Sequence, residues 1–234
     1  MIKSVIFDFD GTLADTNAGI VGTFQETFRR LGMEVPSAER ISSTIGLTLK
    51  DGFKAALDGL TEEEAERAVE LYRSIFFEIA IPCTVAFPQV RETLAALRER
   101  GYILAIATSR SFHSLGTLCD SIGVTEFFEG FYGAESVERH KPAPDLVNLI
   151  LKDFSLAPGE ALVVGDAHYD LLMGQGAGCR VCGVTWGNQS RAQLESVHPD
   201  FLIDSMPQLL ELPVFEGQIF IPRPNSIISA CEKK

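Results

Sequence analysis

Short apolar runs alternate along the chain with longer segments in which apolar residues recur every three or four positions. The apolar runs span Val5–Asp8, Ile103–Thr108, Gly130–Gly133, Ala161–Asp166, Val181–Val184 and Phe201–Ile203. Helical spacing covers Pro88–Arg100, Phe112–Ile122, Asp145–Lys152 and Tyr169–Ala177. Continuous apolar strands joined by helices of this length predict an α/β fold, with a parallel sheet covered by helices on both faces.

Residues 16–84 break this rhythm, because they show helical patterns with no strand between them. Asn17–Leu31 has one apolar face, a shorter pair of helices surrounds Gly46, and Thr61-Glu62-Glu63-Glu64 reads as a capping box that opens another helix. We therefore expect an all-helical cap domain over 16–84, with hinges near Asp15–Asn17 and Cys83–Phe87. The α/β core domain would comprise 1–15 and 85–212. Residues 213–234 form a C-terminal extension of unknown role, in which Glu216–Pro222 alternates weakly and could add an edge strand.

Two carboxylates follow the first apolar run, in Val5-Ile6-Phe7-Asp8-Phe9-Asp10-Gly11-Thr12-Leu13. Alternate residues of a strand point the same way, so Asp8 and Asp10 should project into one small volume at its carboxyl end. Two carboxylates that close repel each other unless a cation or a proton lies between them. Magnesium takes oxygen ligands and binds best where a phosphate supplies some of them. The motif therefore favours phosphoryl chemistry, although an Asp-Gly turn after a strand is also a common structural feature.

Polar residues follow three of the other apolar runs. Thr108 and Ser109 could bind a phosphate oxygen through hydroxyl and backbone N–H groups, or could simply cap the next helix. Lys141, after the third run, could neutralise phosphate and carboxylate, or be an ordinary solvated lysine. Asp166 and Asp170 could ligate a cation, or could favour a helix N-terminus. Because ligands bind beyond the carboxyl ends of parallel strands, these groups together predict one site at that edge of the sheet.

Composition and charge limit the classes of function that fit. The 234 residues are 46% hydrophobic and carry a net charge of −12, so the chain can bury ordinary cores but lacks the clustered Lys and Arg of a nucleic-acid-binding protein. We expect no signal peptide and no membrane span, and the five scattered cysteines suit free thiols in a reducing cytoplasm. The expected partner is a small phosphorylated metabolite, without nucleic acid or membrane, for a cytoplasmic monomer or homodimer.

Taken together, the residues at the four strand ends resemble the haloacid dehalogenase-like hydrolase superfamily. The matching segments are Asp8-Phe9-Asp10-Gly11-Thr12-Leu13, Thr108-Ser109, Lys141-Pro142 and Gly165-Asp166-Ala167-His168-Tyr169-Asp170. The similarity covers most of the chain, includes the position of the helical insertion and is greatest to the phosphoglycolate phosphatase-like branch. It implies a Rossmann-like core with an inserted helical cap, and a phosphatase that hydrolyses a small phosphomonoester such as phosphoglycolate or a sugar phosphate.

The resemblance also implies catalytic roles for four residues. Asp8 would attack phosphorus and form an aspartyl phosphate. Asp10 would protonate the leaving alcohol and then activate water. Thr108 and Lys141 would hold the phosphoryl oxygens, and Lys141 would offset the charge crowded around Asp8.

The implied cofactor is Mg²⁺. Asp8, the backbone carbonyl of Asp10 and Asp166 would hold the ion, with Asp170 supporting the cluster. The metal would stabilise the charge that spreads over the transferring phosphoryl group.

Other functions of the same fold stay open on the residues alone. Relatives that cleave carbon–halogen bonds generally lack the second carboxylate, so Asp10 makes dehalogenation a poor fit. A sugar phosphomutase of the β-phosphoglucomutase type has the same acid pair and cap, and the sequence does not exclude it. A non-catalytic binding protein on this fold is the remaining alternative, which the complete set of motif residues disfavours.

Substrate recognition is harder to predict than catalysis. In the cap, Gly46-Leu47-Thr48-Leu49-Lys50 is the best candidate for a substrate-facing loop, in which Lys50 could meet a carboxylate or a second phosphate. Gly46, Lys50 and Ser109 are therefore our candidate substrate-binding residues. Cys179 and Cys182 form a C-x-x-C pair without a second pair, so we expect core thiols rather than a zinc site.

Overall fold

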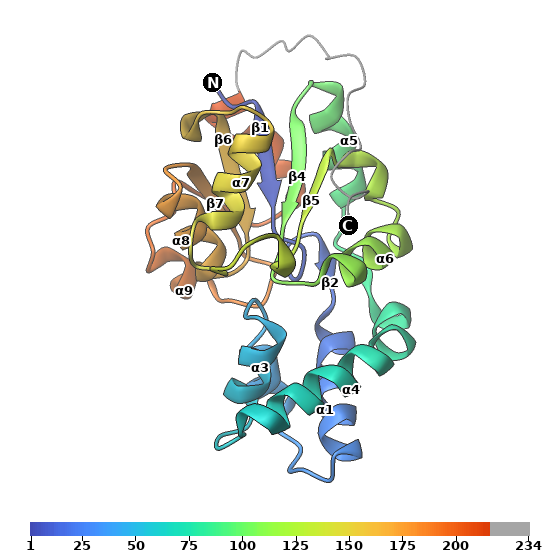
Figure 1. Ribbon diagram of the computed structural model, residues 1–234. Helices are drawn as coiled ribbons and strands as arrows, with labels where there is room; N and C mark the ends of the chain where they lie inside the picture. The colour runs from blue at the N-terminus through green and yellow to red at the C-terminus, as the bar shows by residue number, and fades with distance from the viewer. Residues whose placement is uncertain (216–234) are drawn as a thin grey trace.

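The computed structural model describes residues 1–215, which form two lobes (Figure 1). The upper lobe contains the main sheet, and the lower lobe contains helices α1 to α4. The strands are β1 (Ser4–Phe7), β2 (Ala14–Asp15), β3 (Val85–Ala86), β4 (Ile103–Ala107), β5 (Gly130–Tyr132), β6 (Ala161–Gly165), β7 (Arg180–Val184) and β8 (Phe201–Ile203). The α-helices are α1 (Asn17–Arg30), α2 (Ala38–Ser42), α3 (Leu49–Ala56), α4 (Glu62–Ala80), α5 (Val90–Glu99), α6 (Phe112–Ser121), α7 (Asp145–Asp153), α8 (His168–Gly176) and α9 (Arg191–Glu195).

The main sheet of the described chain has six strands in the order β5-β4-β1-β6-β7-β8, and every neighbouring pair is parallel. The predicted α/β fold with a parallel sheet is therefore confirmed. Phe7 at the end of β1 pairs in register with Ile106 of β4 and Val164 of β6. This register brings the segments that follow β1, β4 and β6 to one edge of the sheet.

Alternation along β1 separates two hydrophobic cores. Val5 and Phe7 belong to a core that also contains the apolar faces of α5 and α6, whereas Ile6 belongs to a core formed with α7, α8 and α9. All three side chains are fully buried. Since successive strand residues point to opposite faces, the unbroken apolar run of β1 follows from burial on both sides.

The helical lobe, formed by α1 to α4, has its own aromatic centre. The ring of Phe53 in α3 lies 4.2 Å from that of Phe24 in α1 and 5.8 Å from that of Tyr72 in α4, measured between centroids. The capping box that opens α4 is present, with Thr61 and Glu64 hydrogen-bonded to each other's backbone. No helix within residues 1–215 is long and apolar enough to cross a bilayer.

Two short strands join the lobes. β2 and β3 pair antiparallel at the two chain crossings, close to the predicted hinges. The sequence pattern did not predict this ribbon, because two residues are too few to show a period. It did not predict α9 either, which has only five residues.

The start of α5 differs from the predicted one. The helix predicted from Pro88 begins instead at Val90, because Gln89 adopts a left-handed conformation with a φ of 63° and ends the preceding turn. Cys179 and Cys182 are buried, as expected for core thiols. Pro213–Phe215 form a short 3₁₀ turn, and the ring of Phe215 contacts that of Tyr102 at 4.9 Å. The weak alternation over Glu216–Pro222 lies outside the described residues.

Candidate active site

Asp8, Lys141 and Asp170 form a buried ion-pair network beyond the end of β1. Nζ of Lys141 donates to Oδ1 of Asp8 and to Oδ1 of Asp170, each at 2.6 Å. The Lys141 side chain is only 1% exposed, so its charge is neutralised by these carboxylates rather than by water. Oδ2 of Asp170 also accepts a hydrogen bond from the backbone N–H of Ala167, which fixes the carboxylate at the start of α8.

Asp166 follows β6 and is held by neighbours from two distant loops. Its Oδ1 accepts from the Thr12 hydroxyl at 3.2 Å, and its Oδ2 accepts from the backbone and side-chain amides of Asn188 at 2.7 and 3.0 Å. Gly11 passes beside this carboxylate with a φ of +83°, and a side chain at Gly11 would collide with it. The glycine of the Asp-Gly-Thr segment is therefore needed both for the turn and for the close approach.

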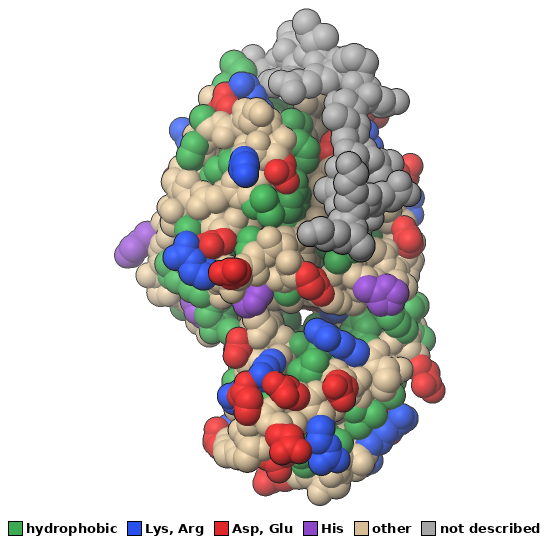
Figure 2. All heavy atoms as spheres, in the orientation of Figure 1, with side chains coloured by type: hydrophobic (Ala, Val, Ile, Leu, Met, Phe, Trp, Pro, Cys, Tyr) green, Lys and Arg blue, Asp and Glu red, His purple; other side chains and the backbone are tan. Residues whose placement is uncertain are grey.

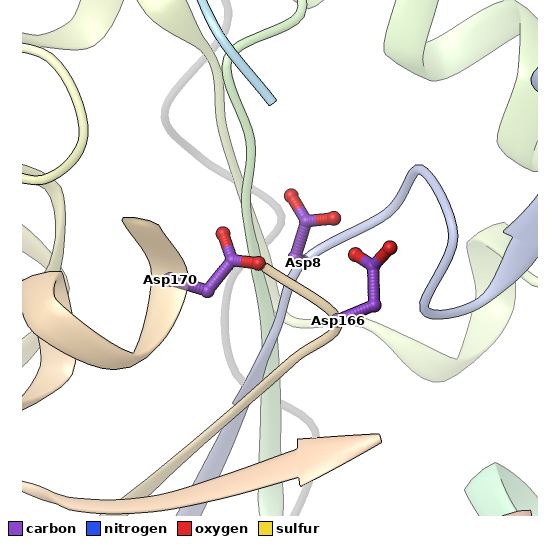
Figure 3. A group of neighbouring side chains, drawn as sticks. All are labelled: Asp8, Asp166 and Asp170. Carbon is purple, nitrogen blue, oxygen red and sulfur yellow. The ribbon is translucent and has the colours of Figure 1, made fainter. Parts of the chain in front are cut away.

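The three carboxylates of Asp8, Asp166 and Asp170 converge (Figure 3). Each offers an oxygen atom, and these atoms lie within 4.8 Å of one another. All three residues are buried. When all are ionised, Lys141 leaves two negative charges uncompensated, which equals the charge of a divalent cation. An all-oxygen donor set with this charge suits a hard cation such as Mg²⁺.

The pKa shifts in the cluster also favour a bound cation. Burial raises the pKa of Asp8 well above the usual carboxyl range, Lys141 opposes this rise, and the carboxylates of Asp170 and Asp166 add to it. Burial and the charge of Asp170 raise the pKa of Asp166 to about 7, although hydrogen bonds from Asn188 favour its ionised form. Burial by itself would lower the pKa of Lys141, but Asp170 and Asp8 outweigh it and raise the pKa. These shifts favour a proton or a bound cation in the cluster over three ionised carboxylates.

Asp10 lies apart from this cluster. Arg110 donates to both of its carboxylate oxygens, from Nε to Oδ2 and from Nη2 to Oδ1, each at 2.6 Å. The Thr16 hydroxyl donates to Oδ1 of Asp10 at 2.5 Å. The Asp10 side chain is thus oriented by a two-point ion pair and by a residue at the entrance to the helical lobe.

The loop after β4 carries the remaining polar residues. Thr108 is buried and its hydroxyl accepts from the backbone N–H of Arg110 at 3.2 Å. Ser109 donates its hydroxyl to the carbonyl of Gly46 at 2.8 Å, across the gap between the two lobes. Ser109 and Gly46, both predicted to bind substrate, therefore contact each other in this structure.

A cavity of about 1070 Å³ separates the sheet edge from the helical lobe. Asp8, Asp10 and Thr108 line it on one side, and Gly46 and Lys50 line it on the other. Figure 2 shows both acidic and basic side chains on the surface of the helical lobe. Nζ of Lys50 is bound by Glu62 and Glu66, the latter at 3.0 Å, so glutamates already offset its charge.

Three residues that contact this site were not among those predicted from the sequence. Arg110 and Thr16 hold Asp10, and Asn188 holds Asp166. Arg110 follows the Thr108-Ser109 pair directly, which is the one positional signal that could have identified it. Asn188 comes from the loop after β7, and no motif in the sequence marks it.

Comparison with known proteins identifies the family. The profile of the haloacid dehalogenase-like hydrolases matches residues 5–184. The chain is 37% identical to a protein of Dickeya dadantii named probable phosphatase IndB, across 88% of this chain and 91% of that protein. It is 33% identical to pyrophosphatase PpaX of Bacillus pumilus, across 90% of this chain and 96% of that protein.

Solved structures agree with the sequence comparisons. A crystal structure from Haemophilus somnus, described as that of a predicted phosphoglycolate phosphatase, matches with a TM-score of 0.83 and 25% identity. The match covers 90% of this chain and 97% of that one. The family profile, the two relatives and this structural match together show that the chain belongs to the haloacid dehalogenase-like hydrolases.

Proposed function

We propose that this hydrolase is a magnesium-dependent phosphatase that acts on a small phosphomonoester. The observation that carries the proposal is the convergence of Asp8, Asp166 and Asp170 around Lys141, next to a cavity that also contains Asp10. The names of the relatives, phosphatase and pyrophosphatase, support a phosphate-bearing substrate for this chain.

In the first half of the reaction, a carboxylate oxygen of Asp8 attacks the phosphorus of the substrate. The bond from phosphorus to the leaving oxygen breaks, Asp10 gives its proton to that oxygen, and Asp8 carries the phosphoryl group as an acyl phosphate. Lys141 and the hydroxyl of Thr108 hold phosphoryl oxygens. Asp8 is suited to attack because Lys141 fixes its Oδ1 at 2.6 Å and thereby orients the carboxylate.

In the second half, water attacks the same phosphorus. Asp10 accepts a proton from the water, the bond between phosphorus and Asp8 breaks, and inorganic phosphate leaves with both residues restored. Magnesium bound by Asp8, Asp166 and the backbone carbonyl of Asp10, supported by Asp170, would offset the negative charge that gathers there.

The helical lobe would act as a cap over this chemistry. We assign it to 16–84, between core segments 1–15 and 85–212, because both crossings pass through the β2–β3 ribbon. Gly46 and Lys50 would face the substrate from the cap, and Ser109 from the core. Closure of the lobe would exclude bulk water during phosphoryl transfer.

The test of this function is phosphate release from a panel of small phosphate esters and the anhydride pyrophosphate. Phosphoglycolate, sugar phosphates, pyrophosphate and p-nitrophenyl phosphate are incubated with the full chain, with MgCl₂ or with a chelator. We expect release that requires MgCl₂ and is abolished by the chelator. Release that persists unchanged in the chelator would contradict the metal assignment. No release from any ester would contradict the phosphatase, and isomerisation of sugar phosphates would then be assayed to test the mutase alternative.

A further inference from the structure

Arg110 occupies the oxygen atoms that Asp10 needs for catalysis. Its guanidinium donates to both carboxylate oxygens of Asp10 at 2.6 Å, and the Thr16 hydroxyl adds a third hydrogen bond. The two side chains are 10% and 12% exposed, so water competes little for these contacts. A proton on either oxygen of Asp10 would face a cationic donor. The ion pair must therefore loosen before Asp10 can pass a proton to a leaving group.

Arg110 has donors left for another anion. The guanidinium carries five N–H groups, and Asp10 uses one on Nε and one on Nη2. Within residues 1–215, the side-chain hydrogen bonds of Arg110 come from Nε and Nη2 and none from Nη1, and this residue lines the large cavity. The guanidinium carbon also lies 5.0 Å from the ring centre of Phe76 and 6.0 Å from that of Phe9. These rings hold the planar group in place without using its N–H donors.

The other Lys and Arg side chains that line the cavity are Lys50 and Arg73. Lys50 is paired with Glu62 and Glu66, and Lys141, at the sheet edge, is paired with Asp8 and Asp170. Arg73, on the wall formed by α4, is the remaining alternative. Arg110 differs from Arg73 in one respect that bears on chemistry, because only Arg110 contacts the proposed acid Asp10.

We propose that Arg110 recognises a second anionic group on the substrate, a phosphate or carboxylate close to the transferred phosphoryl group, and that this exchange frees Asp10 to transfer protons. The proposal rests on the function proposed above and deepens it. The preferred substrates are small esters or anhydrides with two anionic groups. Arg110 is then a specificity-determining residue, and it also controls when Asp10 is free to act as the general acid.

If Arg110 controls Asp10 in this way, substitution of Arg110 should have opposite effects on phosphoglycolate and ethyl phosphate. Phosphoglycolate and ethyl phosphate differ in that a carboxylate replaces a methyl group. Wild type should prefer phosphoglycolate by about 10- to 100-fold in kcat/KM, the range for hydrogen bonds to a charged group. Arg110→Gln should lower kcat/KM for phosphoglycolate, and should raise kcat for ethyl phosphate because the guanidinium no longer occupies both carboxylate oxygens of Asp10. Thr16 still orients Asp10 in that variant.

The experiment measures kcat and KM for both esters, for pyrophosphate and for p-nitrophenyl phosphate, with wild type, Arg110→Gln, Arg110→Lys and Arg73→Gln in MgCl₂. Arg110→Lys keeps the charge but offers one-point contact, so it should keep part of the preference. It also preserves the test if Arg110→Gln does not fold, which a thermal melt would reveal. Arg73→Gln should leave the ratio of kcat/KM values unchanged.

Three results would overturn the inference. Wild type could hydrolyse p-nitrophenyl phosphate yet show no preference for phosphoglycolate or pyrophosphate over ethyl phosphate. Arg110→Gln could lower kcat for all esters equally, which would make Arg110 a purely structural partner of Asp10. The preference could disappear in Arg73→Gln and persist in Arg110→Gln, which would place the second anion on the α4 wall. Failure of wild type on every ester, p-nitrophenyl phosphate included, would instead contradict the proposed phosphatase.

Discussion

Lys141 is the residue that makes the buried carboxylate cluster compatible with a folded protein. It contacts Asp8 and Asp170, and all three side chains are at most 9% exposed. Removing the lysine would leave buried charges without a partner, which is strongly destabilising. The same lysine is proposed to hold the phosphoryl group, so stability and catalysis depend on one side chain.

We predict that Lys141→Met lowers the free energy of unfolding by about 3–5 kcal/mol at pH 7.5 without magnesium. The loss should be smaller at pH 5, because protonated carboxyl groups no longer need the cation. Urea unfolding at the two pH values measures both effects, with Lys152→Met, an exposed lysine on α7, as the control. Equal stability of Lys141→Met and wild type at pH 7.5 would show that the ion pairs do not compensate the cluster.

Some site residues could be predicted from the sequence and others could not. Asp8, Lys141 and Asp166 each follow a recognisable strand, so their place at one sheet edge could be predicted from the topology. Arg110 and Asn188 act through contacts with residues 100 and 22 positions away, at Asp10 and Asp166. Such contacts depend on how loops pack, and the only local signal for either residue is the place of Arg110 directly after Thr108-Ser109.

At the scale of elements, periodicity predicted the sheet and the long helices well. Four of the six predicted strands end one residue beyond the observed ones, at Asp8, Thr108, Gly133 and Asp166. The backbone N–H groups of Asp8 and Thr108 still donate to the neighbouring strands, so the predicted ends differ little from the observed pairing. The β2–β3 ribbon and α9 are too short to show a period. The start of α4 was predictable, because the capping box is a local interaction between Thr61 and Glu64.

Thr61→Ala should lower the free energy of unfolding by about 1 kcal/mol, because the backbone N–H of Glu64 at the start of α4 loses its acceptor, the Thr61 hydroxyl. Ser74→Ala, a solvent-exposed position in the middle of the same helix, is the matched control and should be neutral or slightly stabilising. Denaturant melts monitored by circular dichroism compare the two variants. A larger loss in Ser74→Ala than in Thr61→Ala would be inconsistent with the cap.

At the scale of the whole molecule, an acidic protein concentrates uncompensated negative charge between two lobes. The net charge is −12, and the carboxylates at the sheet edge are buried beside the cavity. A phosphate ester approaches such a protein against its long-range field. Local cations must therefore attract the substrate, and we assign this task to Lys141, Arg110 and the proposed metal ion.

Magnesium should stabilise the protein more at high pH than at low pH. The pKa of Asp8 lies above its ordinary value of 3.8 and that of Asp166 is about 7. The stability that these groups contribute in the metal-free protein is therefore fully present below about pH 4 and is lost as the pH rises toward 7. Magnesium requires the ionised carboxylates, so its binding relieves this loss at pH 8 and competes with protons at pH 5.5.

Thermal melts with and without MgCl₂ at pH 5.5 and 8 measure this coupling. We expect a larger rise in Tm on adding MgCl₂ at pH 8, and a much smaller one for Asp166→Asn. A rise that is the same at both pH values, or the same in Asp166→Asn, would argue against a metal site in this cluster.

The central claim is that Asp8 is the nucleophile of a magnesium-dependent phosphatase. The most direct test compares phosphate release from p-nitrophenyl phosphate and phosphoglycolate, in MgCl₂, by wild type, Asp8→Asn and the exposed control Asp58→Asn. We predict turnover by wild type and by Asp58→Asn, and a loss of at least about 1000-fold in Asp8→Asn, whose melting curve stays cooperative. Turnover by folded Asp8→Asn at a rate close to that of wild type would contradict the mechanism.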